Sequence, residues 1–294
     1  MKILILQNRM GIGDMIMFLP FIEAISKKFK TPVTILAKKN TKVEMYFNNK
    51  EIVEEIMYLE REDNKKHSGV KGFFKLVNEL KLKKFDKVFI FNSSLRYFLI
   101  SKFSGIKEVF HYPLFKKKNQ QIIEAAKEFT LKSIGEDIES TPRLFLKEQD
   151  ILKAKKDHSI DQSITNIILG IGGSGKTKRV PASIFKSFMS KVLKRSNCRF
   201  FLMTGNNIDE LKIMDEIIES EYKEYCTPLN NFTIKEILPI IPNCQIAICN
   251  DSSFSHLSAG LGIKTIVLMV DTPLIYGCLL YTSPSPRDGL LSRM

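Results

Sequence analysis

Short apolar runs rich in β-branched residues alternate with amphipathic stretches along most of the chain, and this alternation limits the possible folds more than any other feature. The runs that predict strands lie at residues 2–6, 32–36, 86–91, 164–169, 200–203, 245–249 and 265–269. Helical periodicity lies between them, at residues 15–29, 73–82, 95–103, 182–194, 208–218 and 234–238. Residues 52–59 fit either a short helix or a strand. Because such alternation is typical of parallel sheets with helices on both faces, we expect an α/β protein with doubly wound sheets.

The alternation stops between residues 110 and 156, where charged helix and irregular chain replace it. It restarts near residue 164, so that each half begins with a strand, a glycine-containing loop and a helix. A length of 294 residues also suggests about two domains. We therefore expect an N-terminal domain over residues 1–156 and a C-terminal domain over residues 157–277.

The last residues, 278–294, follow neither the strand period nor the helix period. Their Ser-Pro-Ser-Pro-Arg run differs from the Lys- and Ile-rich composition that precedes it, and it resembles translated adaptor sequence. We expect this tail to be non-native and the native C-terminus to be missing.

Basic residues outnumber acidic ones by 45 to 32, which gives a net charge of +13. Residues 1–150 hold 28 basic and 19 acidic residues, so most of the surplus lies in the first half. This charge could meet an anionic membrane surface or an acidic substrate, or it could be solvated lysine without a partner. No motif that interleaves aromatic and basic residues accompanies it, so no nucleic-acid partner is expected.

The sequence contains no apolar run of about 18 residues and no cleavable signal at its N-terminus, which predicts a cytoplasmic protein without a membrane span. The five cysteines are odd in number and lack CxxC spacing. They are expected to be reduced packing residues, with no metal site and no disulfide framework.

The segment Gln245–Gly262 reads as a buried strand, an Asx/Ser turn and a small-residue helix. A helix that starts this way leaves its first N–H groups unpaired at the edge of the sheet, with the positive end of its dipole behind them, so it can bind phosphate. Asp251 or Ser252 could instead simply cap the helix. His256 lies one helical turn further on, where it could reach the same ligand or be a core residue.

Residues 170–177 match the pattern GxxxxGK[ST] after a strand, which taken alone predicts an NTPase. A P-loop needs its Lys and Thr in the first turn of a continuous helix. Here Pro181 follows Thr177 closely and disfavours helical geometry at Val180. A Gly/Ser loop that meets phosphate in another geometry is therefore the preferred interpretation, and the P-loop remains an alternative.

Four charged residues near the predicted loops have two interpretations each. Asp14 could cap the first helix or act as a general base. Lys178 and Arg179 could be solvated or could face a leaving phosphate. Asp209 could accept a hydrogen bond from a ribose hydroxyl or cap the helix that begins at residue 208.

With these residues identified, the chain resembles glycosyltransferase family 9, the heptosyltransferase-like enzymes, over residues 1–277. RMGIGDMIMFLP, residues 9–20, is similar to the family's first loop, which ends in Gly-Asp. Lys178-Arg179-Val180-Pro181 is similar to its Lys-Arg-Trp-Pro, with Val in place of Trp. NDSSFSHLSAGLG, residues 250–262, is similar to its Asn-Asp-Thr-Gly-x-x-His motif, with Ser253 in place of Gly.

The resemblance implies the GT-B architecture, in which two doubly wound Rossmann-like domains face each other across the active site. It implies that the first domain binds the acceptor and the second binds the nucleotide sugar. The site residues that it implies are the base Asp14, the acceptor-side loop residues Arg9 and Gly13, and the donor-binding residues Lys178, Asp209, Asp251, Ser252, Ser253 and His256.

The expected function is an inverting transfer of a heptose from ADP-heptose to a lipopolysaccharide core or a related lipid-linked saccharide, without a metal or cofactor. The partners would be the nucleotide sugar, an anionic lipid-linked acceptor and, peripherally, the inner face of the plasma membrane. Two alternatives stay open: a P-loop ATPase or kinase, and a nucleotide-sugar-binding protein without catalysis.

Overall fold

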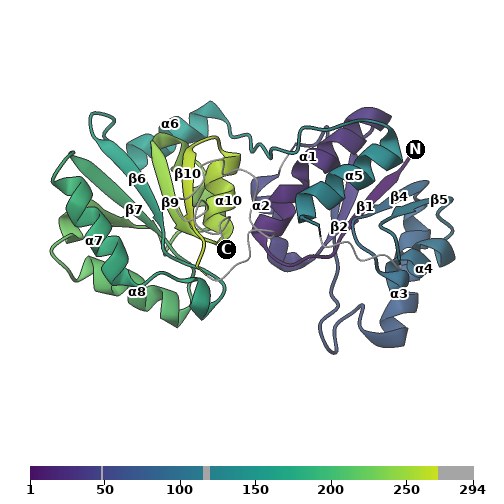
Figure 1. Cartoon of the computed structure of the whole chain (residues 1–294). Coiled ribbons are helices and arrows are strands. Elements are labelled where there is room, and N and C mark those ends of the chain that lie inside the picture. Colours follow the sequence, from purple (N-terminus) through teal and green to yellow (C-terminus); the bar gives the residue numbers. More distant parts are fainter. Residues whose placement is uncertain (48, 115–119, 271–294) are drawn as a thin grey trace, which may run out of the picture. The chain divides into compact units, whose positions relative to one another are not determined.

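The computed structural model describes residues 1–47, 49–114 and 120–270, which form two parallel five-stranded sheets with helices on both faces (Figure 1). The contacts divide the chain into two compact units. The first unit contains Met1–Lys147 and Thr233–Leu238, and the second contains the remaining described residues from Glu148 onward.

The first sheet has the strand order β3-β2-β1-β4-β5, and all its neighbouring strands are parallel. Its strands are β1 (Ile3–Gln7), β2 (Val33–Ala37), β3 (Val53–Tyr58), β4 (Lys87–Ile90) and β5 (Glu108–His111). The helices of this unit are α1 (Ile12–Phe29), η1 (Lys39–Thr41), α2 (Val43–Tyr46), α3 (Gly69–Lys83), α4 (Leu95–Phe103), α5 (Ile122–Ile134) and α9 (Ile234–Ile237).

Alternate residues of the central strands face opposite layers of helices, as the two-residue period of a strand requires. On one face, Leu4 and Leu6 join a core that α3 and α4 complete with Leu76, Leu80 and Ile100. On the other face, the rings of α1 and α5 contact strand residues and the residue after β4; the pairs are Phe18–Phe91, Phe29–Phe89 and Phe129–Phe91. Both faces of the sheet are therefore buried at its centre, which explains why β1 and β2 are almost entirely apolar. The edge strands β3 and β5 are less buried and carry acidic residues.

The second sheet has the order β10-β9-β6-β7-β8 and is also parallel throughout. Its strands are β6 (Thr165–Gly170), β7 (Cys198–Met203), β8 (Cys226–Pro228), β9 (Ile246–Asn250) and β10 (Lys264–Leu268). The helices are α6 (Glu148–Asp157), η2 (Lys176–Lys178), α7 (Ala182–Leu193), α8 (Ile208–Ile218), η3 (Lys223–Tyr225), η4 (Ile241–Asn243) and α10 (Ser253–Gly260). Numbered within its own unit, this sheet repeats the strand order of the first.

The α/β class and the doubly wound sheets predicted from the sequence are confirmed. The ambiguous residues 52–59 contain the strand β3. The short edge strands β5 and β8 were not predicted, because four or three residues show too little periodicity to be recognised. The first helix begins at Ile12, earlier than the predicted residue 15, so Asp14 lies in its first turn instead of in the loop before it.

The predicted domain boundary at residue 156 places α6 in the first domain, whereas the contacts group α6 with the second unit. One reason is that the Asn243 side chain donates a hydrogen bond of 3.1 Å to the Ile151 carbonyl of α6. The predicted tail, residues 278–294, and the end of the predicted second domain lie outside the described residues. Of the helices that the structure describes, none combines the length and the apolar character needed to cross a bilayer.

Candidate functional site

Each sheet has one place where the strand order reverses direction, and ligands of doubly wound proteins bind outside the carboxyl ends of the strands at such a place. In the first sheet this place lies between β1 and β4, and in the second between β6 and β9. The segments that follow these four strands are therefore the positions to inspect for functional side chains.

In the second unit an ion pair bridges the two segments at this place. Lys178 Nζ, after β6, lies 2.9 Å from Asp251 Oδ2, after β9, although the residues are 73 positions apart in sequence. The Asn250 side chain links the same segments. It donates a hydrogen bond of 2.8 Å to the Ile171 carbonyl and accepts one of 3.2 Å from the Val180 N–H. This network brings the lysine to the beginning of α10.

The N-terminus of α10 is not capped by a side chain. Ser252 occupies the N-cap position, but its hydroxyl makes no capping hydrogen bond, and its Oγ is buried without a hydrogen-bond partner among the described residues. Ser253, Phe254 and Ser255 form the first turn, where backbone N–H groups lack intrahelical acceptors. The capping role considered for Ser252 is therefore wrong in this structure, and the turn presents donors beside a lysine.

His256 is the fourth residue of α10, and its side chain is buried. Burial agrees with a core position. Its predicted contact with the donor stays a prediction.

A buried carboxylate that the sequence analysis missed holds two loops of this site together. Glu210, in α8, accepts hydrogen bonds from the Gly205 N–H at 2.7 Å and from the Gly173 N–H at 3.3 Å. A Cβ on Gly205 would lie 2.6 Å from Glu210 Oε2, and one on Gly172 would lie 2.8 Å away. A side chain at either glycine would therefore displace the Glu210 carboxylate. The only sequence signal for this role was an acid that closely follows the glycine after β7.

Asp209 does not cap α8, because the Asn207 side chain accepts the Asp209 N–H at 2.9 Å and performs that role. The Asp209 carboxylate instead lies 3.5 Å from Arg179 Nη2 and 3.6 Å from Lys176 Nζ. The Arg179 side chain is only 7% exposed, and its Nη1 has no hydrogen-bond partner among the described residues. A buried guanidinium nitrogen without an acceptor is a suitable donor to an anionic ligand.

The segment 170–177 does not have the geometry of a P-loop. Lys176 and Thr177 lie in η2, a single 3₁₀ turn, and the chain is extended at Arg179 and Pro181 before α7 begins. Lys176 is 83% exposed and points to Asp209. Lys178 is the lysine that lies beside the start of α10, through its contact with Asp251. The P-loop alternative is therefore wrong for this segment, because no continuous helix follows the glycines.

In the first unit the corresponding place holds an acid beside an arginine. Asp14 lies in the first turn of α1 together with Gly13, and its Oδ1 accepts a hydrogen bond of 2.9 Å from Arg9 Nε. Gly11 is the N-cap residue of the helix; its φ of +104° favours glycine, and a Cβ there would lie 3.8 Å from Asp14 Oδ2. The carboxylate is about one quarter exposed, so it can meet a ligand.

A cavity of about 750 Å³ opens beside Arg9 in the first unit, at the carboxyl ends of β1, β4 and β5. Its walls include the rings of Phe91, Phe110 and Tyr112. Burial raises the pKa of the Tyr112 phenol, and its hydroxyl has no hydrogen-bond partner among the described residues. Aromatic walls with a few polar groups are typical of sites for small organic ligands, including sugars.

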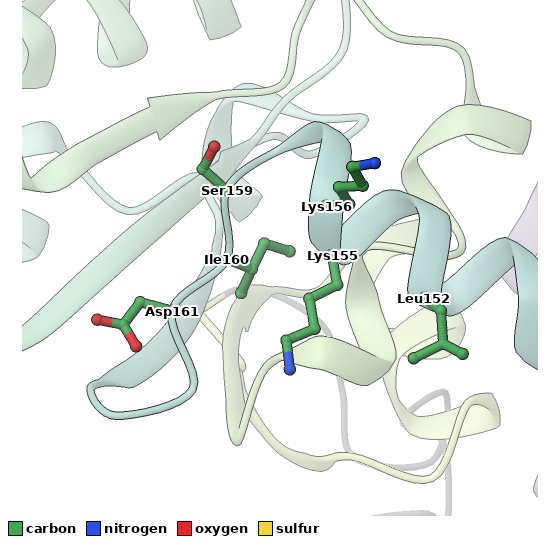
Figure 2. A pocket seen from close by; sticks show the side chains of 6 residues that line it. All are labelled: Leu152, Lys155, Lys156, Ser159, Ile160 and Asp161. Carbon is green, nitrogen blue, oxygen red and sulfur yellow. The ribbon is translucent and has the colours of Figure 1, made fainter.

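A smaller hollow of about 320 Å³ lies at the end of α6 (Figure 2). Leu152, Lys155 and Lys156 reach it from the helix, while Ser159, Ile160 and Asp161 reach it from the chain that follows. None of the predicted site residues lines it, so it is separate from the candidate site. Within the described ranges, no group of three or more His, Cys, Asp and Glu residues is arranged to hold a metal ion.

The family model of glycosyltransferase family 9 (heptosyltransferase) matches residues 102–276, which is more than half of the chain. The chain belongs to glycosyltransferase family 9. This family-9 chain is thus a glycosyltransferase by family, as the resemblance in its motifs predicted. The matched range includes Lys178 and the start of α10, whereas Asp14 precedes it. No curated protein sequence matches the chain.

Solved structures support the GT-B-like fold of this family-9 chain. ADP-heptose lps heptosyltransferase II from E. coli has a TM-score of 0.72 at 17% identity, covering 94% of this chain and 87% of that one. A family 9 glycosyl transferase from Veillonella parvula has a TM-score of 0.73 at 17% identity, covering 94% and 83%. The E. coli heptosyltransferase WaaC with ADP has a TM-score of 0.68 at 14% identity, covering 94% and 89%.

The structure therefore brings the predicted residues into two groups, one in each unit. Lys178, Asp251, Ser252 and Ser253 lie together at the junction of β6 and β9, and Asp209 lies in the first turn of α8, beside Arg179. Arg9, Gly13 and Asp14 lie together after β1. Arg179, which the sequence analysis considered beside Lys178, also lies in the second group, and Glu210 is an addition to it.

Proposed function

We propose that this family-9 enzyme transfers a heptose from ADP-heptose, with inversion, to a hydroxyl of a lipopolysaccharide core or a related lipid-linked saccharide. The observation that carries the proposal is the uncapped start of α10 beside Lys178. That arrangement supplies backbone donors, a helix dipole and a cation for a diphosphate. The neighbours described as binding ADP or ADP-2-deoxy-2-fluoro heptose, both E. coli WaaC, support the choice of donor.

On the donor side, Lys178 would exchange its contact with Asp251 for one with the diphosphate. Ser252 and Ser253 would approach it through their N–H groups, and Arg179 would add a second positive charge. Asp209 would accept a hydrogen bond from a ribose hydroxyl, and His256 would contact the same donor. Charge from the protein would stabilise the leaving group, so the proposed reaction needs no metal ion.

On the acceptor side, Asp14 would act as the general base, with Arg9 orienting its carboxylate. The acceptor hydroxyl loses its proton to Asp14 as its oxygen bonds to the anomeric carbon of the donor. The bond from that carbon to the diphosphate oxygen breaks, and ADP leaves with the electron pair. The aromatic cavity beside Arg9 would hold the sugar ring of the acceptor.

A second candidate function is binding of a nucleotide sugar without catalysis. It would use the same donor-binding residues, but Asp14 would not act as a base. Because the acceptor would be linked to a lipid, we expect the enzyme to associate peripherally with the inner face of the plasma membrane.

The test uses a panel of nucleotide sugars in thermal-shift measurements, followed by a transfer assay with a delipidated core saccharide. ADP-heptose should raise the melting temperature by mass action and should be consumed with release of ADP. Stabilisation by ADP-heptose without any ADP release would favour the non-catalytic candidate. Stabilisation by another nucleotide sugar alone would exclude ADP-heptose as the donor.

A further inference from the structure

Helix α4 is apolar on its exposed side as well as on its buried side. Tyr97, Ile100 and Ser101 are buried against the first sheet. Leu95 and Phe103 face outward, with 50% and 62% of their surface exposed. Large apolar side chains grouped on an exposed helix face mark interaction sites, so this side of α4 is a candidate contact surface.

The neighbouring helix α3 continues this apolar surface. Val70 and Phe74, one turn apart, are 74% and 56% exposed. The half-buried ring of Phe73 joins the two helices, because its centroid lies 5.2 Å from the Phe74 ring and 6.0 Å from the Phe103 ring. We call the surface formed by Val70, Phe74, Leu95 and Phe103 the α3–α4 face.

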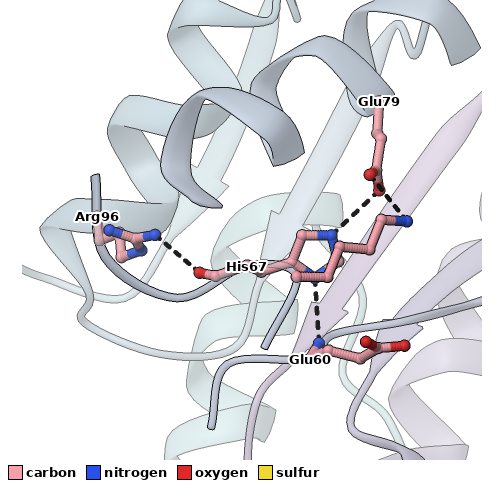
Figure 3. A network of polar contacts seen from close by, with 5 residues as sticks. Glu60, His67, Glu79 and Arg96 are labelled. Carbon is pink, nitrogen blue, oxygen red and sulfur yellow. Dashed lines mark hydrogen bonds and ion pairs between the residues drawn. The ribbon is translucent and has the colours of Figure 1, made fainter. Parts of the chain in front are cut away.

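The two helices are held together rigidly. Arg96 of α4 donates a hydrogen bond of 3.0 Å to the carbonyl of His67, which precedes α3 (Figure 3). It donates another of 2.8 Å to the carbonyl of Gly69, the first residue of α3, and its guanidinium lies 5.4 Å from the Phe73 ring. His67 is buried and lies 3.1 Å from Glu79 of α3. The exposed rings of Phe74 and Phe103 therefore lie on two helices that contact each other directly, and not on a loop.

The same part of the chain carries a strong positive charge. Residues 69–107 contain nine Lys and Arg and two acids, a surplus of seven out of the net +13 of the chain. Glu79, one of the two acids, already contacts Lys66 at 2.8 Å. Lys71, Lys75 and Lys102 are exposed on α3 and α4, beside the apolar residues. Apolar side chains with a lysine border are the pattern of surfaces that lie in the headgroup region of a bilayer.

We propose that the α3–α4 face docks on an anionic phospholipid bilayer, with Phe74 and Phe103 entering the interface and Lys71, Lys75 and Lys102 contacting headgroups. A second copy of the chain fits less well, because a symmetric contact through this face would bring two positive borders together. The assignment deepens the proposed function by naming the surface that would bring the enzyme to a lipid-linked acceptor. It requires no step of the transfer reaction.

The test is co-sedimentation of the full chain with phosphatidylcholine vesicles prepared with and without phosphatidylglycerol. Binding should need phosphatidylglycerol and should weaken as salt is raised. The double variant Phe74→Ser/Phe103→Ser should bind roughly tenfold more weakly, since less apolar area is buried. Lys71→Ala and Lys75→Ala should each weaken binding about fivefold.

Matched controls lie in the second unit, where Ile184→Ser replaces an exposed apolar residue of α7 and Lys191→Ala an exposed lysine of the same helix. Both should bind vesicles as the unaltered chain does. Equal binding by the α3–α4 variants and the controls would overturn the proposal, as would equal binding to vesicles without phosphatidylglycerol. A dimer that the Phe74→Ser/Phe103→Ser variant converts to monomer, measured by sedimentation, would overturn it in favour of a second copy.

Transfer to a delipidated acceptor separates this proposal from the proposed function. The α3–α4 variants should keep full activity in that assay while losing vesicle binding. Vesicle binding that depends on the α3–α4 face, in a chain that consumes no nucleotide sugar, would support the docking surface and overturn the transfer reaction alone.

Discussion

The two units share one strand order, yet the places where that order reverses carry opposite chemistry. Between β1 and β4, the first unit presents the carboxylate of Asp14, held by Arg9. Between β6 and β9, the second unit presents Lys178 beside the uncapped start of α10. The first arrangement can accept a proton and the second can hold an anion, so the repeated topology provides positions whose function depends on a few side chains.

The largest expected effect comes from removing the carboxylate of the first unit. Asp14→Asn should lower kcat by roughly 10²-fold or more and leave the affinity for the nucleotide sugar nearly unchanged, because a general base acts in the transition state. Steady-state kinetics and calorimetry measure the two quantities. Asp63→Asn, at an exposed acid of the same unit, is the control. Near-normal turnover with a lower melting temperature would mean that Asp14 serves only the helix.

The next effect concerns the cation of the second unit. Lys178→Ala should weaken nucleotide-sugar binding by about 10-fold to 100-fold, because a charge-assisted hydrogen bond to the diphosphate is lost. Lys176→Ala is the matched control, since this exposed lysine lies two residues away and points to Asp209. Calorimetric titration in the presence of EDTA measures both variants. Loss of binding in Lys176→Ala with normal binding in Lys178→Ala would contradict the assigned donor group.

The loops of the second unit depend on Glu210, which has no counterpart among the residues described for the first site. Gly205→Ala should lower the free energy of unfolding by about 1–3 kcal/mol, because its Cβ would displace the carboxylate from the backbone N–H groups that it accepts. Gly175→Ala should cost less, since its Cβ would meet no atom closer than 3.7 Å. Denaturant titration measures both. Equal destabilisation would show that Glu210 is not the cause.

A smaller change is expected at the first residue of α10. Ser253→Val should weaken nucleotide-sugar binding several-fold by obstructing the approach to the backbone. Ser253→Gly should bind as well as the unaltered chain or better, because removing Cβ allows a closer approach of phosphate. Ser253→Ala separates loss of the hydroxyl from added bulk. Calorimetric affinities that follow the hydroxyl and ignore the bulk would rule out recognition through the backbone.

The smallest expected effect is a difference in the chemical labelling of cysteine thiols, all of which lie at residue 198 or later. Burial raises the pKa of Cys244 and of Cys249 to about 12, so near pH 8 both remain thiols, the unreactive form. Iodoacetamide should leave them unlabelled in the native chain and label them after partial unfolding, as mass spectrometry of each site would show. This labelling follows the second unit separately from the first. Rapid native labelling of Cys249 would contradict its burial.

Most of the regular structure could be predicted from local patterns. The apolar runs of β1, β6 and β9 and the helical periodicity of α7 and α8 depend on residues within one element, so they are visible without knowledge of the fold. Pro181 similarly disfavoured a P-loop through a local constraint on the residue before it, and the structure agrees, because Lys176 and Thr177 lie in a 3₁₀ turn. The short edge strands were missed because three or four residues carry too little pattern.

The sequence by itself determined the fold class, the family motifs and the residue types at the ends of the strands. Only the tertiary structure decided which of those residues meet. The contact between Lys178 and Asp251 exists because β6 and β9 are neighbours in the sheet, although β7 and β8 separate them in sequence. Glu210 became part of the site in the same way, since the start of α8 meets the loop of Gly173 only after β6 and β7 pair. Strand order is set by packing across the whole core, and no local period encodes it.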